Sequence, residues 1–107
     1  MAKFYTLGCY TAKVLAGFVN NPSTDRKAAT SALAASVWAK VTQYSGLRGN
    51  FDFMAVIEGT FDQAAAAAMV AVSSGAVSDF TILEDVDLNE IAKTAQKMAS
   101  SYKEPGK

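Results

Sequence analysis

The chain has 107 residues, which is the size of a single small domain. Ten basic residues balance ten acidic ones, and a formal net charge of zero argues against a nucleic-acid-binding surface, which needs clustered positive charge. One cysteine and no histidine exclude, within one chain, a disulfide, a cysteine–histidine zinc site, a histidine-based catalytic triad and a haem held by a proximal histidine.

The N-terminal part of the chain predicts one strand followed by two helices. Residues 2–10 are rich in residues that favour strands, above all aromatic ones. Thr11 is a candidate N-cap for a short helix with one apolar stripe, which consists of Val14, Leu15, Phe18 and Val19. Asn21 followed by Pro22 predicts the start of a second helix, which continues to about Ala39 and carries a stripe of small residues.

Residues 40–48 and 51–59 predict an antiparallel hairpin, because Gly49-Asn50 suits a two-residue turn that needs positive φ. In that register Arg48 pairs with Phe51, and alternation predicts the face that lies under helices: Thr42, Tyr44, Gly46, Phe51, Phe53, Ala55 and Ile57. The opposite face also carries apolar residues, namely Val41, Leu47, Met54 and Val56. If helices cover only one face of the sheet, the apolar residues on the other face predict contact with a second subunit.

The remaining chain predicts a helix, a strand and a last helix. Thr60 and Gln63 have the spacing of a capping box, and Gly75 suits the left-handed position at the end of the alanine-rich helix that follows them. Residues 76–86 predict the fourth strand, and Asp87 caps a helix that ends near residue 101. This order predicts an α+β, ferredoxin-like split βαβ sandwich with a four-stranded antiparallel sheet and an extra C-terminal helix. We expect residues 1–102 to form one domain and residues 103–107 to form a flexible tail.

Asp52 lies beside the predicted turn, on the face expected to line a cavity between subunits. One interpretation is structural, because turn aspartates commonly accept hydrogen bonds from nearby N–H groups or pair with a neighbouring cation such as Arg48. The other is ligand contact or acid–base work. A single carboxylate without a visible partner is weak evidence for catalysis.

Three stretches together resemble the GYD domain family over roughly residues 3–92: "KFYTLGCYT", "NPSTDRKAA" and "GNFDFMAVIEGTFDQAAAAAMVAVSSGAV". Gly49 and Asp52 match the Gly-x-Tyr-Asp motif of that family, with Phe51 in place of its tyrosine, and Trp38-Ala39 stands where the family usually has small glycines. The resemblance implies a small cytoplasmic bacterial or archaeal protein of the dimeric α/β-barrel type, without an established activity.

A weaker likeness connects the Gly-x-aromatic-Asp pattern and "GAVSDFTILEDV" with the effector-binding domain of leucine-responsive transcription regulators. It implies a stand-alone version of a domain that holds small effectors, such as amino acids, between subunits. A likeness of this kind concerns the fold and a short motif, and function has to be argued from a site.

Three functions remain open. The favoured one is an oligomeric module that binds a small metabolite at the subunit interface without chemistry, through five candidate residues: Gly49, Phe51, Asp52, Tyr44 and Tyr10. The alternatives are a purely structural oligomer and a cofactor-independent barrel enzyme of the monooxygenase or isomerase type. No catalytic residue, metal ligand or cofactor is predicted.

The expected partner is a second copy of the chain, in a homodimer or larger homo-oligomer, with neither nucleic acid nor a membrane. The sequence has no signal-peptide pattern and no run approaching 18 apolar residues, so a cytoplasmic location is expected. Cys9 is expected to be a small buried side chain in a strand.

Overall fold

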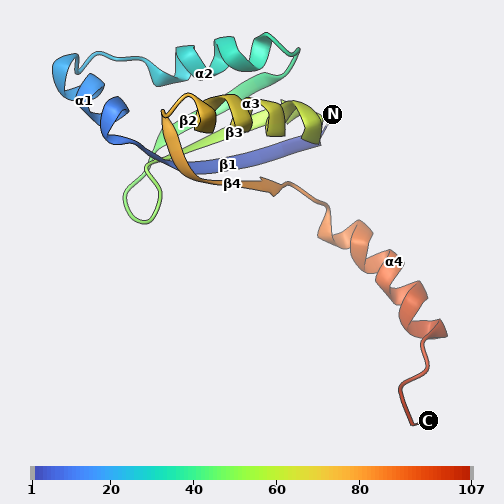
Figure 1. Cartoon of the computed structure of the whole chain (residues 1–107). Coiled ribbons are helices and arrows are strands. Elements are labelled where there is room, and N and C mark those ends of the chain that lie inside the picture. The colour runs from blue at the N-terminus through green and yellow to red at the C-terminus, as the bar shows by residue number, and fades with distance from the viewer. Residues whose placement is uncertain (1, 107) are drawn as a thin grey trace.

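A computed structural model of the chain describes residues 2–106 (Figure 1). Four strands form one antiparallel sheet in the order β2-β3-β1-β4: β1 (Ala2–Tyr10), β2 (Lys40–Gly46), β3 (Phe53–Gly59) and β4 (Val77–Glu84). The helices are α1 (Ala12–Asn20), α2 (Arg26–Ala35), α3 (Phe61–Ser73) and α4 (Leu88–Ser101). The predicted α+β, ferredoxin-like fold with an extra C-terminal helix is confirmed.

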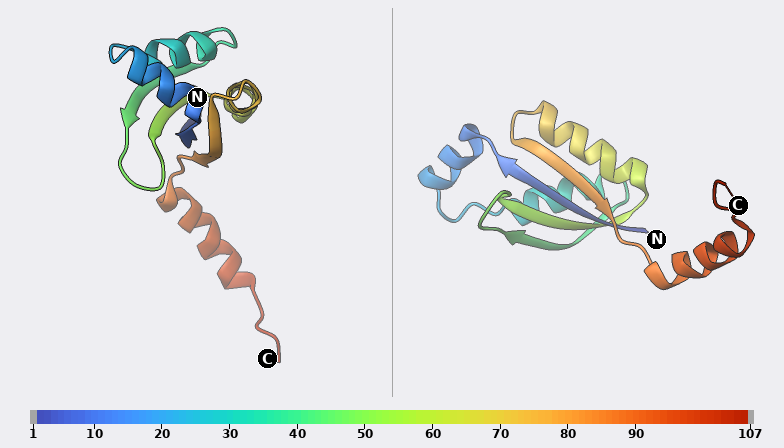
Figure 2. Two further views of the ribbon diagram at one scale, coloured as in Figure 1. Left: turned by 60° about the vertical axis from the view of Figure 1, so that its left-hand side comes forward. Right: turned by 90° about the horizontal axis from the view of Figure 1, so that it is seen from below.

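Helices α2 and α3 lie side by side over one face of the sheet (Figures 1 and 2). The residues of this layer that are almost completely buried are mostly small on the helices and larger on the strands: Phe4, Ala34, Phe53, Ala55, Ile57, Ala64 and Val77. Alanine on a helix lets the backbone lie close to the sheet, and Ala34 of α2 and Ala64 of α3 are buried against it. The burial of the apolar side chains in this layer provides most of the driving force for folding.

The capping box at the start of α3 forms as predicted. The Thr60 hydroxyl accepts a hydrogen bond from the Gln63 backbone N–H at 3.1 Å, and Gln63 Oε1 accepts one from the Thr60 N–H at 2.9 Å. Gln63 Nε2 also donates to the Val37 carbonyl at 2.6 Å, which ties α3 to the segment after α2. That segment is not helical, because α2 ends at Ala35 and Trp38 has a left-handed φ of 67°.

The start of α2 differs from the sequence prediction. Asp25 is the N-cap, and its carboxylate accepts a hydrogen bond from the Ala28 N–H at 2.9 Å. Asn21 instead ends α1, and its side chain accepts from the Ser23 N–H at 3.2 Å in the turn that contains Pro22. The prediction of a helix beginning at Pro22 was therefore wrong, because two residues suited to capping stand four positions apart and the second one is used.

Beside its loop, from Gln43 to Gly46, the hairpin keeps the predicted register, but the loop is longer than predicted. Gly46 pairs with Phe53, and the Leu47 N–H donates to the Asp52 carbonyl at 2.9 Å, so the strands end before the expected two-residue turn. The Asp52 N–H donates to the Gly8 carbonyl at 2.8 Å, which draws the chain toward β1 instead of β2. The loop thus comprises residues 47–52.

A register shift between Val41 and Gln43 changes the assignment of one face. Val41 pairs with Ile57 and packs against the helix-side core, so its predicted place on the opposite face was wrong. The bulge inserts one residue into β2 and thereby reverses the alternation on that side of it. Tyr44, Phe53, Ala55 and Ile57 all border the space under the helices, as predicted.

No helix among residues 2–106 packs on the opposite face of the sheet (Figure 2). The strand register brings its central apolar side chains together, namely Tyr5, Leu7, Met54, Val56 and Leu83. We refer to these five residues as the open sheet face. Leu83 is 52% exposed, whereas Val56 is only 4% exposed.

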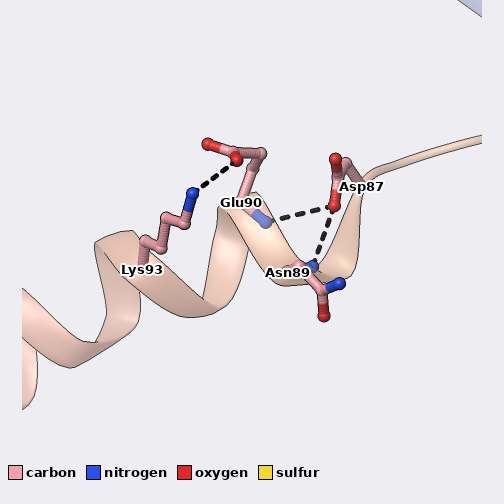
Figure 3. A network of polar contacts seen from close by, with 4 residues as sticks. All are labelled: Asp87, Asn89, Glu90 and Lys93. Carbon is pink, nitrogen blue, oxygen red and sulfur yellow. Dashed lines mark hydrogen bonds and ion pairs between the residues drawn. The ribbon is translucent and has the colours of Figure 1, made fainter.

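Helix α4 leads away from the sheet, and none of its residues is buried (Figure 1). Asp87 caps it as predicted, accepting hydrogen bonds from the N–H groups of Asn89 and Glu90 at 3.0 and 3.2 Å, and Lys93 pairs with Glu90 at 2.9 Å (Figure 3). None of the helices within residues 2–106 combines the length and the apolar character that a membrane span requires. The cytoplasmic location stays a prediction.

Candidate ligand-binding site

Helices α2 and α3 and the sheet enclose a cavity of about 130 Å³. Its floor is formed by Phe53, Ala55 and Ile57 of β3, and α3 contributes Ala67 and Ala71 to its walls. The cavity exists because the small side chains of Ala67 and Ala71 on α3 leave space above β3 that no large residue fills. It is comparable in size to cavities of about 150 Å³ that admit a single benzene ring.

Arg26 is the one charged residue among the described residues that line this cavity. It is the first residue of α2, its side chain is half-buried, and its Nε is buried without a hydrogen-bond partner. A buried donor without an acceptor destabilises a fold by about 1–3 kcal/mol, and by more when it is charged. The cavity therefore combines an apolar interior with one unsatisfied cationic donor.

Two tyrosines stand beside Arg26. The hydroxyls of Tyr10 and Tyr44 are in hydrogen-bond contact, and both rings stack on Phe53 with centroid separations of 5.1 and 5.6 Å. Burial, followed by the hydrogen bond with Tyr44, raises the pKa of Tyr10, and the charge of Arg26 together with its side-chain hydrogen bond to Tyr10 offsets only part of this effect. The Tyr10 phenol is therefore protonated at neutral pH, and the pair acts as a donor of hydrogen bonds.

A second, more open hollow of about 460 Å³ lies outside the cavity. Arg26 and Tyr44 border both spaces, while Tyr10 and Phe18 line only the outer one. Arg26 and Tyr44 thus stand at the boundary between the cavity and the solvent-facing hollow. A molecule that enters from this side meets a cation and a hydrogen-bond donor before it meets the apolar interior.

The five candidate residues from the sequence divide into three groups. Tyr10 and Tyr44 are brought together at the mouth of the cavity. Asp52 uses its carboxylate to accept the Tyr10 backbone N–H at 2.9 Å. Phe51 is half-buried in the loop and Gly49 is exposed there with a φ of 134°, and neither lines the cavity. Whether any of the five contacts a ligand stays a prediction.

Arg26 was missed in the sequence analysis, although the sequence around it contains a signal. Helix α2 begins with Arg26 and Lys27 and has no acidic residue in its first turn. Cations at a helix N-terminus oppose the helix dipole by about 0.3–1 kcal/mol, so this order does not serve helix stability. Such a residue is a candidate for another role.

The thiol of Cys9 and the side chains that could bind a metal also bear on the chemistry of the site. Cys9 was expected to be buried but is only half-buried, and its Sγ donates to the Asn50 carbonyl at 3.3 Å. Within residues 2–106 no three histidine, cysteine or acidic side chains are close enough together to form a metal site. The candidate site therefore offers a guanidinium, phenol hydroxyls and apolar surface.

Comparison with known proteins supports the fold and nothing finer. No protein-family profile and no curated protein sequence matches the chain. The crystal structure of TTHA0845 from Thermus thermophilus is similar with a TM-score of 0.51 and 13% identity, covering 81% of this chain and 95% of that one. The crystal structure of FFRP-DM1 has a TM-score of 0.48 and 11% identity, covering 80% of this chain and 100% of that one. The GYD resemblance stays a prediction.

Proposed function

We propose that this protein is a small-molecule-binding module that holds one ligand in the cavity beneath α2 and α3 and does not transform it. The observation that carries the proposal is an apolar cavity bordered by the buried, unpartnered Nε of Arg26. Ligand sites are commonly concave and mostly apolar, with few polar groups that orient the ligand. The proposed site lies within one protomer, under the helices, rather than between two sheets.

Binding is favoured over catalysis by the state of the polar groups. General acid–base catalysis needs a group whose pKa lies near the working pH. The pKa of Tyr10 is raised, the Asp52 carboxylate is engaged by a backbone N–H, and the chain contains no histidine. The groups at the cavity mouth are thus suited to hold and orient a molecule.

We also propose that a second copy of the chain covers the open sheet face. A contiguous apolar surface on a soluble domain is typical of an interaction site. The support is the alignment of Tyr5, Leu7 and Met54 across β1 and β3, away from the helices. Both the binding hypothesis and the purely structural hypothesis include an interface at this face. Only the binding hypothesis also requires the cavity to hold a ligand.

The experiment is an NMR titration of the isotopically labelled protein with neutral and acidic molecules about the size of one ring. We expect chemical-shift changes to concentrate on the amides of Phe53, Ala55 and Ile57. Ala67→Leu places a larger side chain in the cavity and should abolish these changes. Ala66→Leu is the matched control, because Ala66 is exposed on the same helix and does not line the cavity.

Two results would contradict the proposal. One is a panel in which no compound perturbs the floor of the cavity. The other is an Ala67→Leu variant that is folded and binds the same compounds with unchanged affinity. The control also guards against a general effect of added bulk on α3, since both substitutions enlarge an alanine in the same helix.

A further inference from the structure

The surroundings of Arg26 indicate what kind of ligand the cavity takes. Its guanidinium forms no ion pair with any carboxylate within residues 2–106. The neighbouring Asp25 uses its Oδ1 to cap α2 through the Ala28 N–H, and Arg26 Cζ lies 6.0 Å from the centroid of the Tyr10 ring. Within residues 2–106 no carboxylate therefore pairs with this half-buried cation, whose Nε is shielded from water.

We propose that the ligand is a small organic acid with a ring-sized or branched apolar body, whose carboxylate accepts hydrogen bonds from the Arg26 guanidinium. This inference rests on the proposed function and names the ligand class for the same cavity. Arginine binds carboxylates through two parallel N–H groups in a planar fork, and Nε supplies one edge of that fork. The apolar body lies on Phe53, Ala55 and Ile57.

The position of Arg26 makes this arrangement physically reasonable. Transfer of a carboxylate into an apolar interior is strongly unfavourable unless it is paired and hydrogen-bonded. Arg26 borders both the inner cavity and the outer hollow, so the paired carboxylate stays at the boundary while only the apolar body enters the interior. The cavity volume of about 130 Å³ limits that body to roughly one ring.

The tyrosine pair supplies a second donor at the same place. In a contact between two hydroxyls one proton is used within the pair, and the other remains available to a third group. Tyr44 borders the inner cavity and the outer hollow together with Arg26, so its hydroxyl is placed to donate to the acid once Tyr10 donates to it.

The lining also excludes a class of ligand. None of the described residues that line the cavity is Asp or Glu. An ammonium group would have no counter-charge there and would be repelled by Arg26. The cavity should therefore prefer carboxylic acids to amines.

The test compares matched probes by NMR titration, read at the amides of the cavity floor. The probes are benzoate and isovalerate, their neutral amides, and benzylammonium. We expect each acid to bind about ten-fold or more tighter than its amide, and benzylammonium not to bind. Arg26→Met should weaken the acids by about 10- to 100-fold, with an intermediate effect for Arg26→Lys, which keeps the charge but lacks the fork. Lys97→Met, on the exposed face of α4, removes the same charge elsewhere and should change nothing.

The outcomes separate this inference from the function on which it rests. If the amides bind the cavity floor as tightly as the acids, the acid preference is wrong and the binding function stands. If no probe perturbs the cavity floor, both are wrong. Should Arg26→Met fail to fold, the comparison of acids with amides on the unmodified protein and on Arg26→Lys still shows whether the cavity prefers acids.

Discussion

The bond between the Asp52 carboxylate and the Tyr10 N–H can be tested by substitution. The ladder between β1 and β3 ends at the pair Gly8–Phe53, and the carboxylate accepts the Tyr10 N–H at 2.9 Å beyond that end. The Asp52 carboxylate therefore replaces the backbone carbonyl that a further paired residue of β3 would offer to the Tyr10 N–H. Asp52→Ala leaves the Tyr10 N–H without this acceptor in a half-buried position, which should destabilise the protein by about 1–3 kcal/mol.

Asp52→Asn should have a smaller effect, because its amide oxygen can accept the same bond. A hydrogen bond to a charged group contributes about 1.5–3 kcal/mol and a neutral one about 0.5–1.5 kcal/mol, so we expect a loss of about 1 kcal/mol. That loss corresponds to a fall in Tm of roughly 4–8 °C for a domain of this size. Asp79→Asn is the control, because Asp79 is exposed, has a φ of 50° that asparagine tolerates, and should change stability by less than about 0.5 kcal/mol.

The assay is urea unfolding followed by circular dichroism at one protein concentration, combined with hydrogen exchange of the Tyr10 amide. Exchange of that single amide should accelerate in Asp52→Ala and much less in Asp52→Asn. The reasoning is refuted if Asp52→Ala unfolds at the same urea concentration as the unmodified protein, or if protection of the Tyr10 amide is unchanged. Asp52 would then be available for the ligand contact that its position in the sequence suggested.

Three further outcomes are expected. Gly8→Ala should destabilise the protein by about 1–3 kcal/mol, because the added Cβ would lie 2.9 Å from Val77 Cγ1. Gly46→Ala is the control, because an added Cβ there would meet no atom within 4 Å. Equal urea midpoints for the two variants would contradict the prediction. If the chain assembles through the open sheet face as proposed, Met54→Lys should shift it to monomer in sedimentation experiments, because an unpaired ammonium in an apolar interface is strongly unfavourable. Normal assembly of this variant would show that the open sheet face is not the interface. The raised pKa of Tyr10 means that the folded state holds this proton more tightly than the unfolded state. Its contribution to stability should be complete below pH 10.0 and should decrease as the pH rises from there toward the folded pKa, and Tyr10→Phe should remove that part of the pH dependence.

The sequence alone determined the elements whose signals are local. The Thr60–Gln63 capping box, the Asp87 cap and the left-handed Gly75 each depend on residues within one turn of the chain, and all three formed as predicted. Alternation also identified the helix-covered face of β3, since a strand side chain changes face at every residue. Local rules were insufficient at α2, where Asn21 and Asp25 both suit a cap and only the packed structure selects the second.

The candidate site was decided by tertiary structure. Tyr10 and Tyr44 were both proposed as ligand residues, but their contact depends on the order of strands in the sheet. Asp52 was interpreted as a turn residue or a ligand residue, and its carboxylate accepts a backbone N–H from a residue 42 positions away in the sequence. Arg26 reaches the cavity because α2 crosses the sheet beside α3. These contacts join residues distant in the chain, and their geometry follows from strand order, a bulge in β2 and helix placement, none of which a local pattern of residue types encodes.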